Sequence, residues 1–152
     1  MGTMEDLEEW VWPKVEAWAH VVRTLVKTSK PYPHSEYAGL GISLQIECQY
    51  LKSTIPGVGS LMGPIDDALR EAFFYATFGG EEVSDNIREI LGHSMKHEGL
   101  GIPEHQMLTD RAYNISKAAI EVLLGSLFGG TKLNYVAYKG CVHRASDDGW
   151  KQ

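Results

Sequence analysis

Cysteine and positive charge are both scarce in this chain, and each shortage excludes a class of protein. Only two of its 152 residues are cysteines, Cys48 and Cys141, and they stand far apart. Two isolated thiols give neither a disulfide framework nor a cysteine-rich zinc site, and they favour a reducing compartment. With 14 basic and 20 acidic residues, the formal net charge is -6. That balance disfavours a stand-alone nucleic-acid binder, because phosphate affinity comes mostly from Lys and Arg.

Long apolar runs and an export signal are also missing from the sequence. No run of about 18 apolar residues occurs, so we expect no membrane span. Residues 1–6 are acidic where a signal peptide would be basic, which predicts an intracellular, cytoplasmic protein. A length of 152 residues suits one domain with its own core. The prediction is a single domain over residues 1–152, with residues 1–3 and 147–152 flexible.

What the sequence does contain is apolar residues at helical spacing. Over residues 7–25 they recur at steps of three and four, which indicates one face of a helix. Thr3 is followed three residues later by Asp6, a pattern that resembles a helix start. Pro13 removes a backbone donor, so we expect a short first turn and a fresh start near Trp12.

The same periodicity predicts further helices along the rest of the chain. They are expected to start at Ser35, Pro64, Ser84, Thr109 and Asn134. No convincing run of alternating strand residues occurs anywhere in the sequence. The predicted fold class is therefore all-α, a helical bundle of about five to six helices.

The first predicted helix carries tryptophans on more than one side. Trp10 and Trp12 lie off its main apolar face. Such a helix needs a second layer or a partner to cover the exposed rings. We therefore expect a homo-oligomer, and specifically a homodimer.

Several short motifs follow one another in a characteristic order and spacing. They are Tyr37-Ala38-Gly39-Leu40, Ser43-Leu44-Gln45, Gln49-Tyr50-Leu51, Pro56-Gly57-Val58-Gly59, Gly63-Pro64-Ile65, Ala68-Leu69-Arg70-Glu71-Ala72-Phe73, Phe78-Gly79-Gly80 and Gly99-Leu100-Gly101-Ile102-Pro103. Together they resemble the region downstream of the palm in retroelement reverse transcriptases of eukaryotic microbes, over residues 8–146. The resemblance implies a helical thumb and the segment after it, which grips the template–primer duplex in such enzymes.

The resemblance does not extend to the chemistry of polymerisation. In these enzymes the catalytic aspartates come from the palm, upstream of the motifs found here. Asp66-Asp67 resembles the second half of a Tyr-x-Asp-Asp signature, but Pro64 stands where the tyrosine would be. Both aspartates stand at a predicted helix start, where negative charge favours the helix dipole. The resemblance therefore implies no polymerisation by this chain itself, with nucleic acid bound only in the context of a full reverse transcriptase.

A second hypothesis, a small stand-alone hydrolase of an ester or lactone, concerns Ser94. Residues 92–96 read Gly-His-Ser-Met-Lys, which departs from the Gly-His-Ser-Met-Gly elbow of lipases at the last position. That elbow also follows a strand, whereas a helix is predicted here. Ser94 remains a candidate nucleophile with His93, His97 or Lys96 as its base, because a serine needs only a positioned base.

The same stretch, residues 92–105, also offers a metal site. His93 and His97 are four residues apart, a spacing that puts two imidazoles on one helical face, and His105 lies eight residues further on. Three histidines can hold zinc with a water in the fourth position, which is a route to ester or lactone hydrolysis. The catalytic candidates are therefore Ser94, His93 and His97, and the metal-ligand candidates are His93, His97 and His105.

A third hypothesis is a module that binds single-stranded nucleic acid. The C-terminal part of the chain interleaves basic and aromatic residues, namely Lys132, Tyr135, Tyr138, Lys139, Arg144 and Lys151. Such a pattern can bind phosphates and stack on bases. Asp147 and Asp148 dilute the charge, which favours an ordinary solvated face instead.

Overall fold

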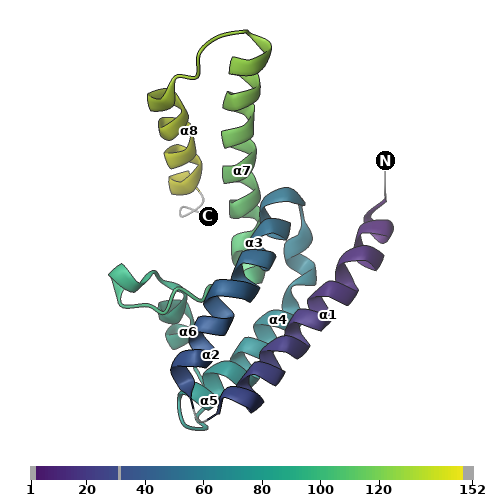
Figure 1. The fold of residues 1–152 in the computed structure, drawn as a ribbon, viewed down its shortest axis with the longest axis vertical. Helices are drawn as coiled ribbons and strands as arrows, with labels where there is room; N and C mark the ends of the chain where they lie inside the picture. Colours follow the sequence, from purple (N-terminus) through teal and green to yellow (C-terminus); the bar gives the residue numbers. More distant parts are fainter. Residues whose placement is uncertain (1–2, 31, 149–152) are drawn as a thin grey trace.

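The computed structural model describes residues 3–30 and 32–148, and every regular element in these ranges is helical (Figure 1). This confirms the all-α prediction. Of the residues predicted to be flexible, 1–2 and 149–152 lie outside the described residues. The elements, in chain order, are α1 (Met4–Ser29), α2 (Pro33–Gly39), η1 (Leu40–Leu44), α3 (Gln45–Thr54), η2 (Val58–Leu61), α4 (Gly63–Ala68), η3 (Leu69–Phe74), α5 (Tyr75–Thr77), α6 (Asp85–Gly92), η4 (Met95–His97), α7 (His105–Phe128) and α8 (Tyr135–Asp148).

Two of the helical segments contain a wider turn of π-helix. The run α2–η1–α3 is continuous over residues 33–54, and the run α4–η3–α5 is continuous over residues 63–77. The short helices on either side of each π-turn therefore belong to one longer rod. The described residues thus form the helical bundle that the apolar periodicity predicts.

Helix α1 begins where the sequence predicts, but it is not broken at Pro13. The Thr3 side chain accepts a hydrogen bond from the backbone N–H of Asp6, and the Asp6 carboxylate accepts one from the backbone N–H of Thr3. This reciprocal pair is a capping box. Pro13 lies inside the helix, so the predicted restart there is wrong. Val11 and Val15 are fully buried on either side of it, which holds both flanking turns in the core.

The core lies where α1, the α2–α3 run and the α4–α5 run meet. Helix α1 packs against α4 and η3, and α3 packs against α7. One stripe of the α2–α3 run is buried, as its periodicity predicts, while the second apolar stripe of the same run is exposed to solvent. The buried stripe is Leu40, Leu44, Cys48 and Leu51, and the exposed stripe is Ile42, Ile46 and Tyr50.

Helices α7 and α8 form an antiparallel hairpin whose far end projects beyond the core (Figure 1). Asn134 caps α8 as predicted, because its side-chain oxygen accepts hydrogen bonds from the backbone N–H groups of Val136 and Ala137 at 3.1 Å each. The projecting end leaves Leu127 and Phe128 75% and 88% exposed. Within the described residues, no helix is long and apolar enough to cross a membrane.

Two predicted helix starts are wrong. The run predicted to start at Ser35 begins at Pro33, and no side chain caps it. The helix predicted to start at Thr109 begins four residues earlier, at His105. Thr109 is instead fully buried in the second turn, where its hydroxyl donates to the carbonyl oxygen of His105 at 2.6 Å. The earlier start brings His105 into the folded core.

A single methyl group at Gly99 is expected to destabilise the fold. A Cβ atom there would lie 2.0 Å from the carbonyl oxygen of His93 and 2.7 Å from that of Ile90, and both atoms are backbone. Because backbone cannot swing aside, we expect Gly99→Ala to lower the free energy of unfolding by about 2–4 kcal/mol in urea denaturation. Gly41→Ala is the matched control, since nothing lies within 4 Å of its added Cβ. Helix propensity predicts a gain of about 0.5–1 kcal/mol for that control.

Candidate functional site

The histidine-rich stretch forms a loop over residues 93–104, and one buried arginine anchors it. Arg88 of α6 is 1% exposed. Its Nη1 donates to the carbonyl oxygen of Ile102 at 2.6 Å, and its Nη2 donates to that of Pro103 at 2.9 Å. The guanidinium also lies 4.8 Å from the centre of the Phe74 ring. The planar fork of an arginine suits two neighbouring carbonyl acceptors, so Arg88 fixes the end of the loop.

The α2–α3 run holds the middle of the same loop. The Tyr37 hydroxyl donates to the carbonyl oxygen of Leu100 at 2.5 Å, and the Gln45 amide donates to that of Gly101 at 3.3 Å. The backbone N–H of Leu100 donates in turn to the carbonyl oxygen of Leu91 at the end of α6. The loop is therefore tied to two separate helices and is not a free surface segment.

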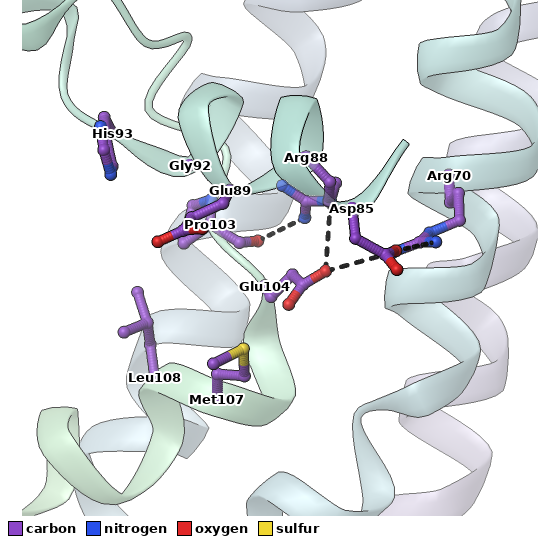
Figure 2. A pocket seen from close by; sticks show the side chains of 10 residues that line it. All are labelled: Arg70, Asp85, Arg88, Glu89, Gly92, His93, Pro103, Glu104, Met107 and Leu108. Carbon is purple, nitrogen blue, oxygen red and sulfur yellow. Dashed lines mark hydrogen bonds and ion pairs between the residues drawn. The ribbon is translucent and has the colours of Figure 1, made fainter. Parts of the chain in front are cut away.

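A cavity of about 460 Å³ opens on one side of the loop, and Figure 2 shows the side chains around it. Arg70 Nη1 lies 2.7 Å from the Asp85 carboxylate, and Arg70 Nη2 lies 3.4 Å from the Glu104 carboxylate. Glu104 also lies 3.9 Å from Arg88 Nε. The arginines of this cavity thus already have carboxylate partners. Its lining residues are Arg70, Asp85, Arg88, Glu89, Gly92, His93, Pro103, Glu104, Met107 and Leu108.

Ser94 and His97, two of the predicted catalytic residues, do meet. The Ser94 hydroxyl lies 3.0 Å from His97 Nδ1, and both side chains are exposed, Ser94 just before the short η4 turn and His97 at its end. Within the described residues, no carboxylate orients the other nitrogen of His97. His93 lines the cavity of Figure 2 instead. The structure therefore forms a serine–histidine pair without the third group of a catalytic triad.

The three histidines predicted as metal ligands do not form a metal site in this structure. His105 is 2% exposed, at the first turn of α7, and its Nδ1 lies 3.1 Å from Asp66. His97 is exposed and bonded to Ser94. Among residues 3–30 and 32–148, no group of three or more His, Cys, Asp or Glu side chains could hold a metal ion. The spacing of His93, His97 and His105 assumed one helical face, but the loop separates them.

Asp66 supplies the helix cap that the sequence of α7 itself lacks. Its carboxylate accepts hydrogen bonds from the backbone N–H groups of His105 at 2.8 Å and Gln106 at 2.9 Å. No side chain at the start of α7 makes such a bond. Asp66 was predicted to stabilise its own helix, but it caps a helix that starts 39 residues later. The one signal in the sequence is that Glu104, the residue before α7, is not a typical capping residue, which suggests that the cap comes from elsewhere in the chain.

The pKa shifts of Asp66 and His105 indicate which of the two side chains is charged. Burial raises the pKa of Asp66, but the hydrogen bonds from His105 and Gln106 outweigh it and bring the pKa below its usual value. Burial lowers the pKa of His105 and outweighs the effect of Asp66. At neutral pH Asp66 is therefore ionised and accepts only, so Nδ1 of a neutral His105 carries the donated hydrogen. The other ring nitrogen, Nε2, is left as an acceptor.

Comparison with known proteins found no matching family model, no matching curated protein and no matching solved structure. The geometry itself offers two distinct chemical arrangements. One is the exposed Ser94–His97 pair, and the other is the buried Asp66–His105 pair. Both come from residues at or beside the loop of residues 93–104, which makes this loop and its two flanking surfaces the candidate functional site.

Asp66→Asn is expected to destabilise the protein in a pH-dependent way. The folded-state pKa of Asp66 lies below its unfolded value, so its contribution is fully present above about pH 4 and is lost as the pH falls through the lower, folded-state pKa. We expect the substitution to cost about 2 kcal/mol at pH 7, because it weakens charge-assisted hydrogen bonds in a half-buried site. Urea denaturation at several pH values measures this cost.

The matched control is Asp67→Asn, one residue along α4. Asp67 is exposed, and no hydrogen bond or ion pair joins it to the described part of the chain. We expect it to change the free energy of unfolding by less than about 0.5 kcal/mol at every pH. An equal cost for both variants, or a cost for Asp66→Asn that does not shrink at low pH, would contradict the capping role of Asp66.

Proposed function

We propose that this chain is a helical, thumb-like segment of a reverse transcriptase, which does not polymerise by itself. The ordered motifs over residues 8–146 carry this proposal. The all-α architecture supports it, because a thumb of this kind is expected to be helical. The role of such a segment is to grip a nucleic-acid duplex in the context of the full enzyme.

The contacts among the motifs are the observation that supports the proposal best. Tyr37 and Gln45 belong to the first two motifs, and both donate to carbonyl oxygens of the last motif, at Leu100 and Gly101. Gly59, in the fourth motif, packs so closely on α7 that a Cβ atom would lie 2.9 Å from the carbonyl oxygen of Gln106. Residues more than 50 positions apart in the resemblance thus hold one another in place.

Exposed tryptophans on α1 support the proposal, because another part of such an enzyme would cover them. Trp10 and Trp12 are 51% and 42% exposed, although indole rings are among the most favourable groups to bury. Lys14 Nζ lies 4.4 Å from the centre of the Trp10 ring. We assign Trp10 and Trp12 to the contact with a palm.

The direct test adds this chain to a fingers–palm fragment of a retroelement reverse transcriptase from a eukaryotic microbe. We expect the chain to bind that fragment with a Kd on the order of 1 μM and to lengthen its primer-extension products. The chain alone should extend no primer. Trp10→Ser with Trp12→Ser should weaken binding by about tenfold or more. Absence of both binding and longer products would contradict the proposal.

Without a palm, the uncovered α1 surface is expected to cause self-association. Light scattering across a concentration series should show a homodimer that dissociates on dilution. The double variant Trp10→Ser and Trp12→Ser should remain monomeric at the same concentrations. The control is Ile42→Ser with Tyr50→Ser, which removes exposed apolar area from the α2–α3 run instead. A monodisperse monomer for the wild-type chain would count against the assignment.

The alternative function is hydrolysis of an ester or lactone at Ser94, and one distance favours it. The Ser94 hydroxyl lies 3.0 Å from His97 Nδ1, within reach for proton transfer to the imidazole. If the pair is active, Ser94→Ala and His97→Ala should each lower the hydrolysis of a chromogenic ester and of a lactone by at least about 100-fold. Ser60→Ala, another exposed serine, is the control. Equal rates for all four proteins would remove this alternative.

A further inference from the structure

Lys52 is a buried lysine without a counter-ion. It lies on α3 and is only 3% exposed. It makes no hydrogen bond and no ion pair with any residue in the described part of the chain. Lysine is almost never this deeply buried unless it is paired, because removing an ammonium group from water is costly. The Nζ of Lys52 is not among the fully enclosed, unpartnered polar atoms of the described residues, so the ammonium keeps contact with solvent through an opening by which a ligand can reach it.

This lysine lines a second cavity, which shares only Pro103 with the cavity of Figure 2. The cavity has a volume of about 420 Å³. Its residues come from η1 and α3, from the loop and from the start of α7, and Pro103 lines both this cavity and the other. The lining residues are Gly41, Gln45, Ile46, Gln49, Lys52, Gly101, Pro103 and His105. Unlike the other cavity, this one has no carboxylate in its lining.

The charged and titratable groups around Lys52 leave its ammonium unneutralised. Cys48, one turn earlier on α3, is fully buried, and burial raises its pKa to about 12, so it stays a neutral thiol. Asp66 of α4 is ionised, but its oxygens are occupied by His105 and Gln106. His105 of α7 is neutral. Burial therefore lowers the pKa of Lys52, and the negative charge of Asp66 offsets this only in part.

We propose that this cavity binds a small organic carboxylate, with the carboxylate on Lys52 and the hydrocarbon body against Ile46 and Pro103. The Gln49 side-chain amide donates to the Ser53 hydroxyl at 3.2 Å and has a second N–H that can donate to the same carboxylate. His105 Nε2, free to accept, suits a hydroxyl or amine on the ligand. Small-molecule sites have this composition, with apolar walls and a few polar groups that fix orientation.

The charge of the site favours a carboxylate over a phosphate. One ammonium group can neutralise one negative charge, and Asp66 already places a further negative charge near it. A phosphate dianion would leave about one charge uncompensated beside the ionised Asp66, which is costly. Inorganic phosphate is therefore the comparison ligand in the test, and benzoate is the probe for the carboxylate.

The experiment titrates the full chain by calorimetry with benzoate, benzamide and inorganic phosphate. We expect a Kd for benzoate of roughly 1 mM. Benzamide has the same shape without the charge, and both it and phosphate should bind at least tenfold more weakly. Lys52→Met should weaken benzoate binding at least tenfold, while Lys27→Met, which removes an exposed lysine from α1, should leave it unchanged.

The pH dependence gives a second readout on the unmodified protein. A carboxylate binds the ammonium form of Lys52, so its affinity falls as the pH rises above the lowered pKa of the free state. We expect benzoate binding to weaken steadily as the pH is raised from about 6, where benzoic acid is already ionised, through the lowered pKa of Lys52. Benzamide binding should show no such change.

The variant itself is expected to fold. Methionine replaces an unpaired buried ammonium with an apolar group of similar length, so the melting temperature of Lys52→Met should rise. The proposal is overturned if benzoate does not bind, if Lys52→Met binds benzoate as tightly as wild type, or if benzamide or phosphate binds as well as benzoate. Should Lys52→Met fail to fold, the benzamide, phosphate and pH comparisons on the wild-type chain decide the proposal alone.

Discussion

The clamp of Arg88 on the carbonyl oxygens of Ile102 and Pro103 is the interaction on which the site depends. Burying a guanidinium is costly, and burial lowers the pKa of Arg88 although the Glu104 charge offsets part of that effect. Two short charge-assisted hydrogen bonds and the face of Phe74 compensate for the lost water. Because these partners lie on the loop of residues 93–104 and on η3, Arg88 joins the end of the loop to the core, while Tyr37 and Gln45 hold its middle.

The loop in turn contributes to the walls of two cavities of different character. Pro103 lines both of them. In one cavity, Arg70 and Arg88 face the carboxylates of Asp85 and Glu104, so the charges balance within the chain. In the other cavity, Lys52 has no counter-ion among the described residues. A ligand that brings its own negative charge therefore gains more in the second cavity, since the arginines of the first would have to give up a partner.

The sequence predicted the features that depend on near neighbours and missed those that join distant segments. The caps of Thr3 and Asn134 were predictable because each bonds a residue two or three positions away. The cap of α7 comes from Asp66, which stands 39 residues before His105 and gives no local signal. The prediction of a three-histidine metal site missed for the same reason. It assumed helical spacing, whereas these histidines lie in and beside a loop that Tyr37 and Gln45, more than 50 residues away, hold in place.

The buried faces of α6 and α3 differ most from those that hydrophobic periodicity predicts, because each of them includes a charged residue. The apolar residues of α6 are Ile87, Ile90 and Leu91. Only Leu91 among them is buried; Ile87 and Ile90 are 46% and 49% exposed, while Arg88 is 1% exposed. On α3, Tyr50 is 68% exposed and Lys52 only 3%. Hydrophobic periodicity assigns charged residues to the solvent, so it cannot identify the positions where a specific hydrogen-bond arrangement or an open cavity overrides that preference.

Amide hydrogen exchange on Arg88→Met tests the clamp most directly. Methionine keeps apolar contact with Phe74 but cannot donate to the carbonyl oxygens of the loop. We predict that the amides of Leu100 and Ile102 lose roughly 100-fold in protection, the equivalent of two hydrogen bonds to a charged group, and that the amides of α1 lose much less. Unchanged protection at Leu100 and Ile102, or an equal loss at every amide, would contradict the account.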